Sequence, residues 1–407
     1  MWEFQVVRNP NQSIHSTQAF RLATLLRSVA EGLITISVPF QAIHLGAGPQ
    51  QLGILGGLSS GSYTVGCLVF ARLIGRLPMR GSVLLVLAAL SVIGLAIGFA
   101  PNLVLLCVVL VVCGLVTSLF WPQVMTWLAE NAGTKGMTHE FGGFNLSWCA
   151  GMPVGMLIGG WLFEKNTYLP YFVSFVVTWV AIAIFWRFTS PRNSHLISTT
   201  DASVTPEQLE SSSRARTFLL MSWIGNFATY YLAGNIRYQL PKLVKSVGMG
   251  EGAFGSLVFL INAAQLATFL VLMRTERWHF KRTFLWWAQV LVVLASLIVY
   301  SSVKPGALAV AFLCAGVGLG ITYFSSQYYG IRYPLGRGRR AAIHESLIGG
   351  GYLAGALCGG LIAHAYSLRA PYLASAFVIL ALLAAQILFD KYRHPVVTRP
   401  KGQPVAR

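Results

Sequence analysis

Long apolar segments separated by short polar ones dominate the chain. A helix needs about 20 predominantly apolar residues to cross a bilayer. Twelve segments reach this length, and a polar segment rich in Ser and Thr divides them six and six. The pattern therefore predicts twelve membrane-spanning helices. The expected spans are 20–43, 50–74, 80–100, 103–129, 140–163, 168–188, 217–240, 252–273, 282–302, 306–330, 342–365 and 371–389.

The fifth expected helix of each half carries the same pattern. His139-Glu140 and His344-Glu345 each precede a ladder of small residues that steps by four. That spacing places the small residues on one helix face, where a second helix can approach closely. We interpret the chain as two related six-helix bundles, 1–189 and 216–407, joined by a linker at 190–215. The residues expected to pack helices together are Gly142, Gly151, Gly155, Gly159, Gly351, Gly355 and Gly359.

Composition and charge support a membrane protein. Hydrophobic residues make up 55% of the chain and charged residues 10%, although the net charge is +18. The basic residues lie between apolar segments and not on a soluble face, which argues against a nucleic-acid partner. Because basic residues concentrate on the cytoplasmic side, we expect both termini and the linker to be cytoplasmic, in a plasma (bacterial inner) membrane. The outer connections would then hold six of the 30 basic residues: Lys165, Arg237, Lys242, Lys245, Lys304 and Arg369.

Twelve spans in two sets of six, a central linker and a basic loop between helices 2 and 3 resemble the major facilitator superfamily. The family's antiporter signature has a glycine spacing that helix 5 repeats, with Met156 at the place of the family's proline. The resemblance implies an all-α fold whose two bundles expose a central cavity alternately to either side. It also implies a proton-linked exporter. The matching glycines are Gly142, Gly151, Gly155, Gly159 and Gly160.

Two departures separate the chain from that family pattern. In the loop between helices 2 and 3, Arg72 stands where the family has an Asp before Gly75-Arg76. Helix 4 lacks the exporter-type arginine, because no charged residue occurs from 103 to 128. The proton-coupling residues of drug exporters are therefore not carried over to this chain.

One ion pair is expected inside helix 1. Inserting a charged residue at a helix centre into the membrane costs roughly 2.5–3.5 kcal/mol on insertion scales. We therefore expect Glu31 to have either a charged partner or a functional role. Arg27 precedes it by four residues, which is the spacing of a pair on one helix face. Either the pair stabilises the bundle, or Glu31 faces the cavity and takes up protons or contacts a cationic substrate.

Polar and aromatic residues within other spans are candidates for the cavity lining. In the family, helices 1, 4, 7 and 10 line the central cavity. Such side chains would hydrogen-bond a polar solute and hold its apolar part. The alternative is that each one bonds a neighbouring helix. The candidates are Ser118, Trp121, Gln123, Asn226, Tyr230, Tyr231, Asn235, Asn262, Gln265, Ser326, Gln327 and Tyr328.

A charged gate is expected at the inner ends of the helices. The family fold brings helix 2 to helix 11 and helix 8 to helix 5. Arg72 would then face Glu345, and Arg274 or Arg277 would face Glu140. The alternative is that each Glu stabilises a helix N-terminus, which is worth about 0.3–1 kcal/mol.

No phosphate-binding glycine loop and no metal-ligand spacing occurs, and the six cysteines lie inside apolar segments. We therefore expect no cofactor, no metal and no enzyme activity. The expected function is secondary transport of a small organic solute by a monomer, coupled to protons, with export favoured. The alternatives are a proton-coupled importer or a uniporter of a sugar-like metabolite and, more remotely, a membrane enzyme or a sensor.

Overall fold

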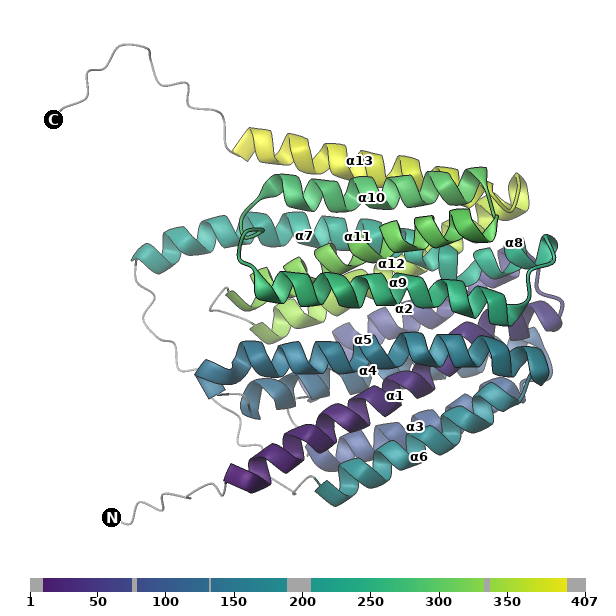
Figure 1. Ribbon diagram of the computed structural model, residues 1–407, viewed down its shortest axis with the longest axis horizontal. Helices are drawn as coiled ribbons and strands as arrows, with labels where there is room; N and C mark the ends of the chain where they lie inside the picture. The colour runs from purple at the N-terminus through teal and green to yellow at the C-terminus, as the bar shows by residue number, and fades with distance from the viewer. Residues whose placement is uncertain (1–9, 75–78, 132, 189–205, 333–336, 394–407) are drawn as a thin grey trace, which may run out of the picture.

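The computed structural model describes residues 10–74, 79–131, 133–188, 206–332 and 337–393, with side chains over 18–70, 80–121, 123–124, 143–188, 215–330 and 340–389. These residues form thirteen α-helices and no strand (Figure 1). The helices are α1 Pro10–His44, α2 Pro49–Ile74, α3 Met79–Gly98, α4 Leu103–Asn131, α5 Gly133–Lys165, α6 Leu169–Phe188, α7 Pro206–Tyr238, α8 Leu240–Ser246, α9 Glu251–Arg274, α10 Arg282–Ser301, α11 Pro305–Arg332, α12 Arg337–Ala365 and α13 Ala370–Arg393.

Among the described helices, eleven are long and apolar enough to cross a membrane, which leaves out α7 and the short α8. The expected span 217–240 corresponds to α7, which begins earlier, at Pro206, and ends at Tyr238, two residues before the expected end. Asn226, Asn235 and Arg237 make this helix more polar than the others. Because it packs against α10, α11, α12 and α13, most of its described residues are buried. A helix shielded by other helices does not need a lipid-compatible surface.

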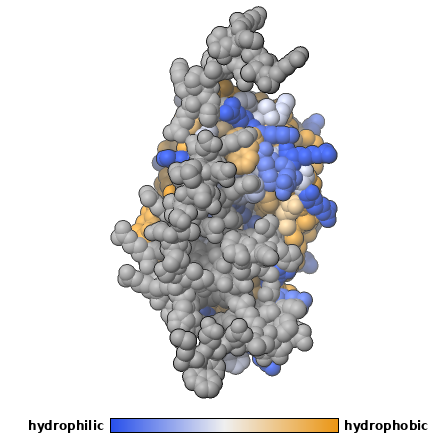
Figure 2. All heavy atoms as spheres, turned by 90° about the vertical axis from the view of Figure 1, so that its left-hand side faces the viewer, coloured by the Kyte–Doolittle hydropathy of each residue, from blue (hydrophilic) through white to orange (hydrophobic). Residues whose placement is uncertain are grey.

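The long helices run side by side, so the molecule has two ends (Figure 1). We call the end that holds the start of α1 and the end of α13 the proximal end. The distal end holds the short connections 45–48, 99–102, 166–168, 302–304 and 366–369 and the helix α8. Seen from the proximal end, hydrophilic residues are visible beside the hydrophobic sides of the bundle (Figure 2). The helices also expose large apolar side chains, such as Leu85 and Val104, as is typical of a protein surrounded by lipid.

Helices α1–α6 and α7–α13 form two groups that repeat one packing arrangement. In the first group α1 packs against α5, and in the second α7 packs against α12. The two groups meet mainly where α2 packs against α12 and where α5 packs against α9. The glycine-rich helices α5 and α12 therefore pack both against a helix of their own group and against a helix of the other group.

Small residues bring the backbones of α5 and α1 together. A Cβ atom added at Gly151 would meet the carbonyl oxygen of Leu25, and one at Gly155 would meet that of Val29. At Gly159 an added Cβ would lie 3.0 Å from the nearest backbone atom of α1. Because these neighbours are backbone atoms, a side chain at these positions would force the helices apart. Gly142 lies outside the residues whose surroundings are described.

The same contact recurs between α12 and α7. A Cβ at Gly351 would lie 2.9 Å from the carbonyl oxygen of Phe227, and one at Gly355 would meet that of Tyr231. At Gly359 it would meet the side chain of Asn235. Both glycine ladders therefore face the first helix of their own group.

Several polar contacts join the groups at the distal end. They include hydrogen bonds from Gln239 to the Pro49 carbonyl oxygen and from Trp161 to the Ser256 hydroxyl, and two more made by Lys242 and Glu164. The Lys242 ammonium donates a hydrogen bond of 2.6 Å to the carbonyl oxygen of Ala47. The Glu164 carboxylate accepts one of 2.9 Å from the backbone N–H of Gly252, in the first turn of α9. A carboxylate at a helix N-terminus also meets the positive end of the helix dipole. These contacts hold the distal ends of the groups close together.

Gly155→Ala should destabilise the protein, because the added methyl group would overlap the backbone of α1. Overpacking of this kind costs about 1–3 kcal/mol. We expect a lower melting temperature of the purified protein in detergent. Gly306→Ala is the control, because a Cβ there has open space around it. Equal melting temperatures for both variants would contradict the packing argument.

Lys242→Ala combined with Glu164→Ala should separate the distal ends. Each lost contact is worth about 1 kcal/mol, since the two side chains are partly exposed. Spin labels at Pro101 and Lys304, in a variant without the native cysteines, should then show a longer distance component in double electron–electron resonance. Lys165→Ala is the control, because that exposed residue neighbours Glu164. An unchanged distance distribution in the double variant would show that these contacts do not hold the distal end.

Candidate functional site

A cavity of about 110 Å³ lies where the two helix groups meet. Its walls come from α1 and α5 of the first group and from α7, α9, α10, α11 and α12 of the second. The cavity is therefore built by both halves of the chain. Its polar and aromatic lining residues are Thr35, Trp148, Thr229, Tyr230, Arg237, Phe254, Asn262, Gln265 and Tyr352.

Three of the candidates from the sequence lie in this lining. They are Tyr230 on α7 and Asn262 and Gln265 on α9. The Asn262 amide donates weakly, over 3.6 Å, to the sulfur of Met156 on α5. The Gln265 amide nitrogen is buried and has no hydrogen-bond partner among the described residues. Donors of this kind remain available to a solute in the cavity.

The candidates on α4 are not among the lining residues. Ser118 donates to a carbonyl oxygen of its own helix, over 2.7 Å. Gln123 accepts a hydrogen bond of 2.6 Å from Ser82 of α3. The Trp121 ring packs 4.9 Å from the Phe120 ring, between centroids. These residues make contacts within the first helix group.

The other candidates on α7 also lie outside the lining. Asn235 donates a hydrogen bond of 3.0 Å to the hydroxyl of Ser375 on α13. Tyr231 is 5% exposed and lies against Gly355 of α12. Asn226 is fully buried, and neither atom of its amide has a partner among the described residues.

Two α11 candidates contact histidines. The Ser326 hydroxyl lies 2.7 Å from Nδ1 of His344 on α12. The Tyr328 hydroxyl lies 3.2 Å from Nδ1 of His279, and the two rings stack with centroids 4.3 Å apart. Both contacts stay inside the second helix group.

Two hydrogen bonds join the helix groups on the proximal side of the cavity. The Tyr63 hydroxyl of α2 donates to the Glu345 carboxylate of α12 over 2.7 Å. The Asn145 amide of α5 donates to Gln327 of α11 over 2.9 Å. Glu345 and Gln327 thus contact the other half through neutral partners. The two helix groups are thus hydrogen-bonded to each other on both the proximal and the distal side of the cavity.

The charged gate that the sequence suggested is only partly described. The side chains of Arg72 and Glu140 lie outside the described residues. Arg274 and Arg277 are exposed at the proximal end of the second helix group. The proposed pairs of Arg72 with Glu345 and of Arg274 or Arg277 with Glu140 stay a prediction.

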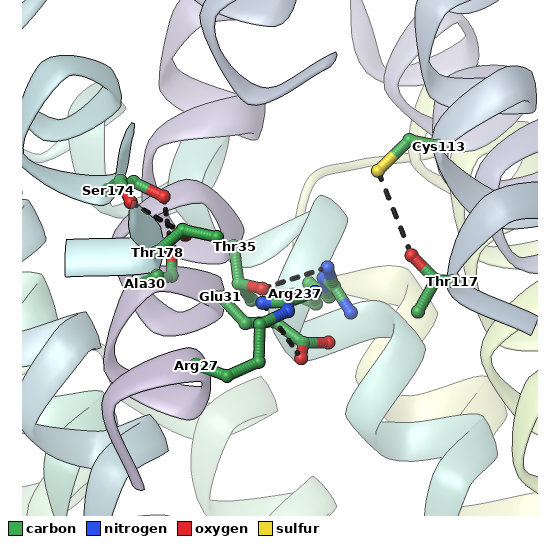
Figure 3. A network of polar contacts seen from close by, with 9 residues as sticks. All are labelled: Arg27, Ala30, Glu31, Thr35, Cys113, Thr117, Ser174, Thr178 and Arg237. Atoms are coloured by element: carbon green, nitrogen blue, oxygen red, sulfur yellow. Dashed lines mark hydrogen bonds and ion pairs between the residues drawn. The ribbon is translucent and has the colours of Figure 1, made fainter. Parts of the chain in front are cut away.

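A network of polar contacts joins charged side chains of α1 to Thr35 and Arg237, which line the cavity (Figure 3). Nη1 of Arg27 is 3.5 Å from a carboxylate oxygen of Glu31, one turn further along α1. The Arg27 side chain is 7% exposed and stands 5.6 Å from the centroid of the Phe120 ring, whereas the Glu31 side chain is 22% exposed. Thr35, one turn beyond Glu31, reaches the cavity and accepts a hydrogen bond of 3.2 Å from Arg237 of α7. Arginine residues from both halves thus approach the same carboxylate region.

Arg237 is the site residue that the sequence argument missed. The charge pattern of the sequence places it in an outer connection, whereas it lies in the last turn of α7 and lines the cavity. The signal was available, because position 237 falls inside the expected span 217–240. A charged residue within a span is by default a functional candidate.

The site offers hydrogen-bond donors and acceptors, aromatic faces and a charged group, which are the groups that bind a small molecule. Among the described residues no cluster of three or more His, Cys, Asp or Glu side chains is placed to hold a metal ion. The cavity walls also come from elements of both halves, so any rearrangement between the halves changes the site directly.

Several solved structures share the fold. The nucleoside transporter NupG is 10% identical, with a TM-score of 0.70 over 93% of this chain and 99% of that one. The human organic anion transporter MFSD10 is 15% identical, with a TM-score of 0.65 over 92% and 99%. A bacterial homolog of the human lysosomal transporter Spinster, in its inward-facing occupied conformation, is 14% identical, with a TM-score of 0.69 over 92% and 96%.

No curated protein matches the chain in sequence. The family profile of the Major Facilitator Superfamily, however, matches residues 21–334 and 223–407. Together the two matches cover nearly the whole chain, including every element that lines the cavity. The fold, its two helix groups and the profile agree, and the chain therefore belongs to the Major Facilitator Superfamily of membrane transporters.

Proposed function

We propose that this transporter moves a small organic solute through the central cavity, coupled to protons through Glu31, in the direction of export. The observation that carries the proposal is the position of the Arg27–Glu31 ion pair beside a cavity built by both halves. In alternating access, a site of this kind is exposed to each side in turn.

The cavity size favours a small solute. Pockets for drug-sized ligands measure about 300–1,000 Å³, whereas this cavity measures about 110 Å³. Hydrogen bonds join the halves on its distal and proximal sides. Breaking one set and keeping the other would open the cavity to one side and enlarge it.

Glu31 is the best candidate for proton coupling. It is a carboxylate deep in α1, and part of its side chain remains accessible. Its buried oxygen is the one that lies 3.5 Å from Arg27, and this oxygen makes no hydrogen bond of normal geometry to the described residues. Protonation would remove its attraction to Arg27 and change the charge next to Thr35 and Arg237. Proton binding and the geometry of the solute site would thereby be linked.

Support for export comes from α5, whose glycine spacing resembles the family's antiporter signature. Gly151 and Gly155 contact the backbone of α1 at Leu25 and Val29, on either side of Arg27. Sliding of α5 along this surface would move the helix that carries Glu31. We place the proximal end in the cytoplasm of a plasma or bacterial inner membrane, because most basic residues lie there.

The second candidate is a uniporter. The Arg27 guanidinium, 3.5 Å from Glu31, gives this carboxylate an ion-pair partner on its own helix face. In that case the pair stabilises α1, and solute moves down its own gradient without protons.

Glu31→Gln should abolish proton-driven transport, because the amide cannot release a proton. Proteoliposomes containing the pH dye pyranine and the purified protein would be tested with uridine, glucose, benzoate and ethidium. A solute whose movement is coupled should change the internal pH in the wild type but not in the variant. The sign of the pH change gives the direction of coupling.

Glu276→Gln is the control, because Glu276 is exposed between α9 and α10, away from the cavity. The Glu31 variant should elute as the wild type does in size-exclusion chromatography. Solute movement that carries protons equally well in both variants would refute the role of Glu31. Solute movement without any pH change in the wild type would favour the uniporter.

A further inference from the structure

Arg237 is a cation at the cavity wall that lacks a carboxylate of its own. Its Nη2 donates to the neutral hydroxyl of Thr35, over 3.2 Å. Its Nε is buried and has no hydrogen-bond partner among the described residues. In the described part of the chain, no carboxylate oxygen lies within 4.0 Å of its guanidinium. Charged groups away from water are normally paired, so this one has room for a further partner.

Glu31 does not fill that place. Its carboxylate pairs with Arg27, at 3.5 Å, on the same helix. The group of Arg27, Glu31 and Arg237 therefore combines two guanidinium ions with one carboxylate. A second carboxylate, Glu345 on α12, is within electrostatic reach of Glu31 and Tyr230, and it accepts a hydrogen bond from Tyr63. If Arg27, Glu31 and Arg237 are ionised, the summed charge of these three side chains is positive, and Figure 3 shows them converging between α1 and α7. A positive, partly dehydrated site attracts an anion.

The surroundings of Arg237 are aromatic and apolar. Its guanidinium lies 5.4 Å from the Tyr238 ring centroid and 5.6 Å from that of Tyr352. The Tyr352 ring stands 5.1 Å from the Tyr230 ring, nearly at a right angle to it. Trp148 also lines the cavity. Rings arranged in this way offer faces and edges to a flat apolar group.

We propose that the cavity binds a small organic monocarboxylate, with the carboxylate at Arg237 and an aromatic or similarly flat body among Tyr230, Trp148 and Tyr352. The inference rests on the proposed transport function and names its substrate class. The planar guanidinium offers two parallel N–H donors, which match the two oxygens of a carboxylate. Thr35 and the unpartnered Gln265 amide supply hydrogen bonds near the same site.

The proposed site distinguishes ligands mainly by their charge and less by their shape. An uncharged amide of the same size would fit the same walls but would leave Arg237 without a counter-ion. A cation would be repelled by Arg237. The volume of about 110 Å³ excludes bulky anions such as nucleotides from the closed cavity. The discriminating comparison is therefore between an acid and its own amide.

The test measures thermal stabilisation of the purified transporter by matched pairs of probes. The probes are benzoate with benzamide, phenylacetate with phenylacetamide, and 4-hydroxybenzoate with 4-hydroxybenzamide, in a buffer of constant chloride concentration. At least one acid should raise the melting temperature and should do so more than its amide. If no acid exceeds its amide, or if none stabilises the protein, the inference is overturned.

Arg237→Gln should weaken binding of the stabilising acid about 10- to 100-fold, the effect of losing a hydrogen bond to a charged group. Arg187→Gln is the matched control, because Arg187 lies 5.5 Å from the Phe188 ring on α6, outside the cavity lining. Equal affinity in the Arg237 variant and the wild type would overturn the inference.

If Arg237→Gln does not fold, Arg237→Lys and Tyr352→Leu take its place. The lysine variant should keep the preference for acid over amide with lower affinity, because a point charge replaces the planar pair of donors. Tyr352→Leu should reduce the affinity for the acid and its amide together. A lysine variant with no preference, or a leucine variant with unchanged affinity, counts against the site.

Proteoliposomes separate this inference from the proposed function. Acid binding that depends on Arg237, without movement of the acid across the membrane, would support the site but refute the transport function. Movement of amides or sugars without any binding of acids would support transport and overturn the substrate class.

Discussion

Close approach of helix backbones is the constraint on which the rest of the structure depends. Gly151 and Gly155 leave α5 no side chain that would hold α1 away, and Gly351 and Gly355 do the same for α12 and α7. In a membrane, where apolar surface gains little from leaving lipid, such packing is a main source of helix association. This packing fixes the positions of α1 and α7, which carry Glu31 and Arg237 and form part of the cavity wall.

Much of the fold follows from the sequence, because spans are long and their signal is strong. Each of the twelve expected segments falls on one long helix and extends at most two residues beyond it, and the family resemblance is confirmed. The start of α7 at Pro206 was missed, since a polar helical extension has no hydropathy signal. The short α8 was missed for a different reason, because seven residues are too few to show a period.

The site was harder to predict, because hydropathy shows which residues are in a span but not which way they face. Tyr230, Asn262 and Gln265 line the cavity, whereas Ser118 and Asn235, equally polar, bond to neighbouring groups. The sequence pattern predicts an outer connection for Arg237, because basic residues are typical of helix ends as well as of binding sites within spans. Only the packing of α1, α7 and α12 shows which polar residues face the cavity and which contact a neighbouring helix.

The polarity of α7 also has a consequence for how the protein is made. Asn226, Asn235 and Arg237 lower the free energy that this segment gains on leaving the insertion machinery for lipid. Its shielding partners α11 and α12 begin at Pro305 and Arg337, so they are synthesised well after it. Stable integration of α7 must therefore wait for later segments, which makes the second half a cooperative unit of biogenesis as well as of structure.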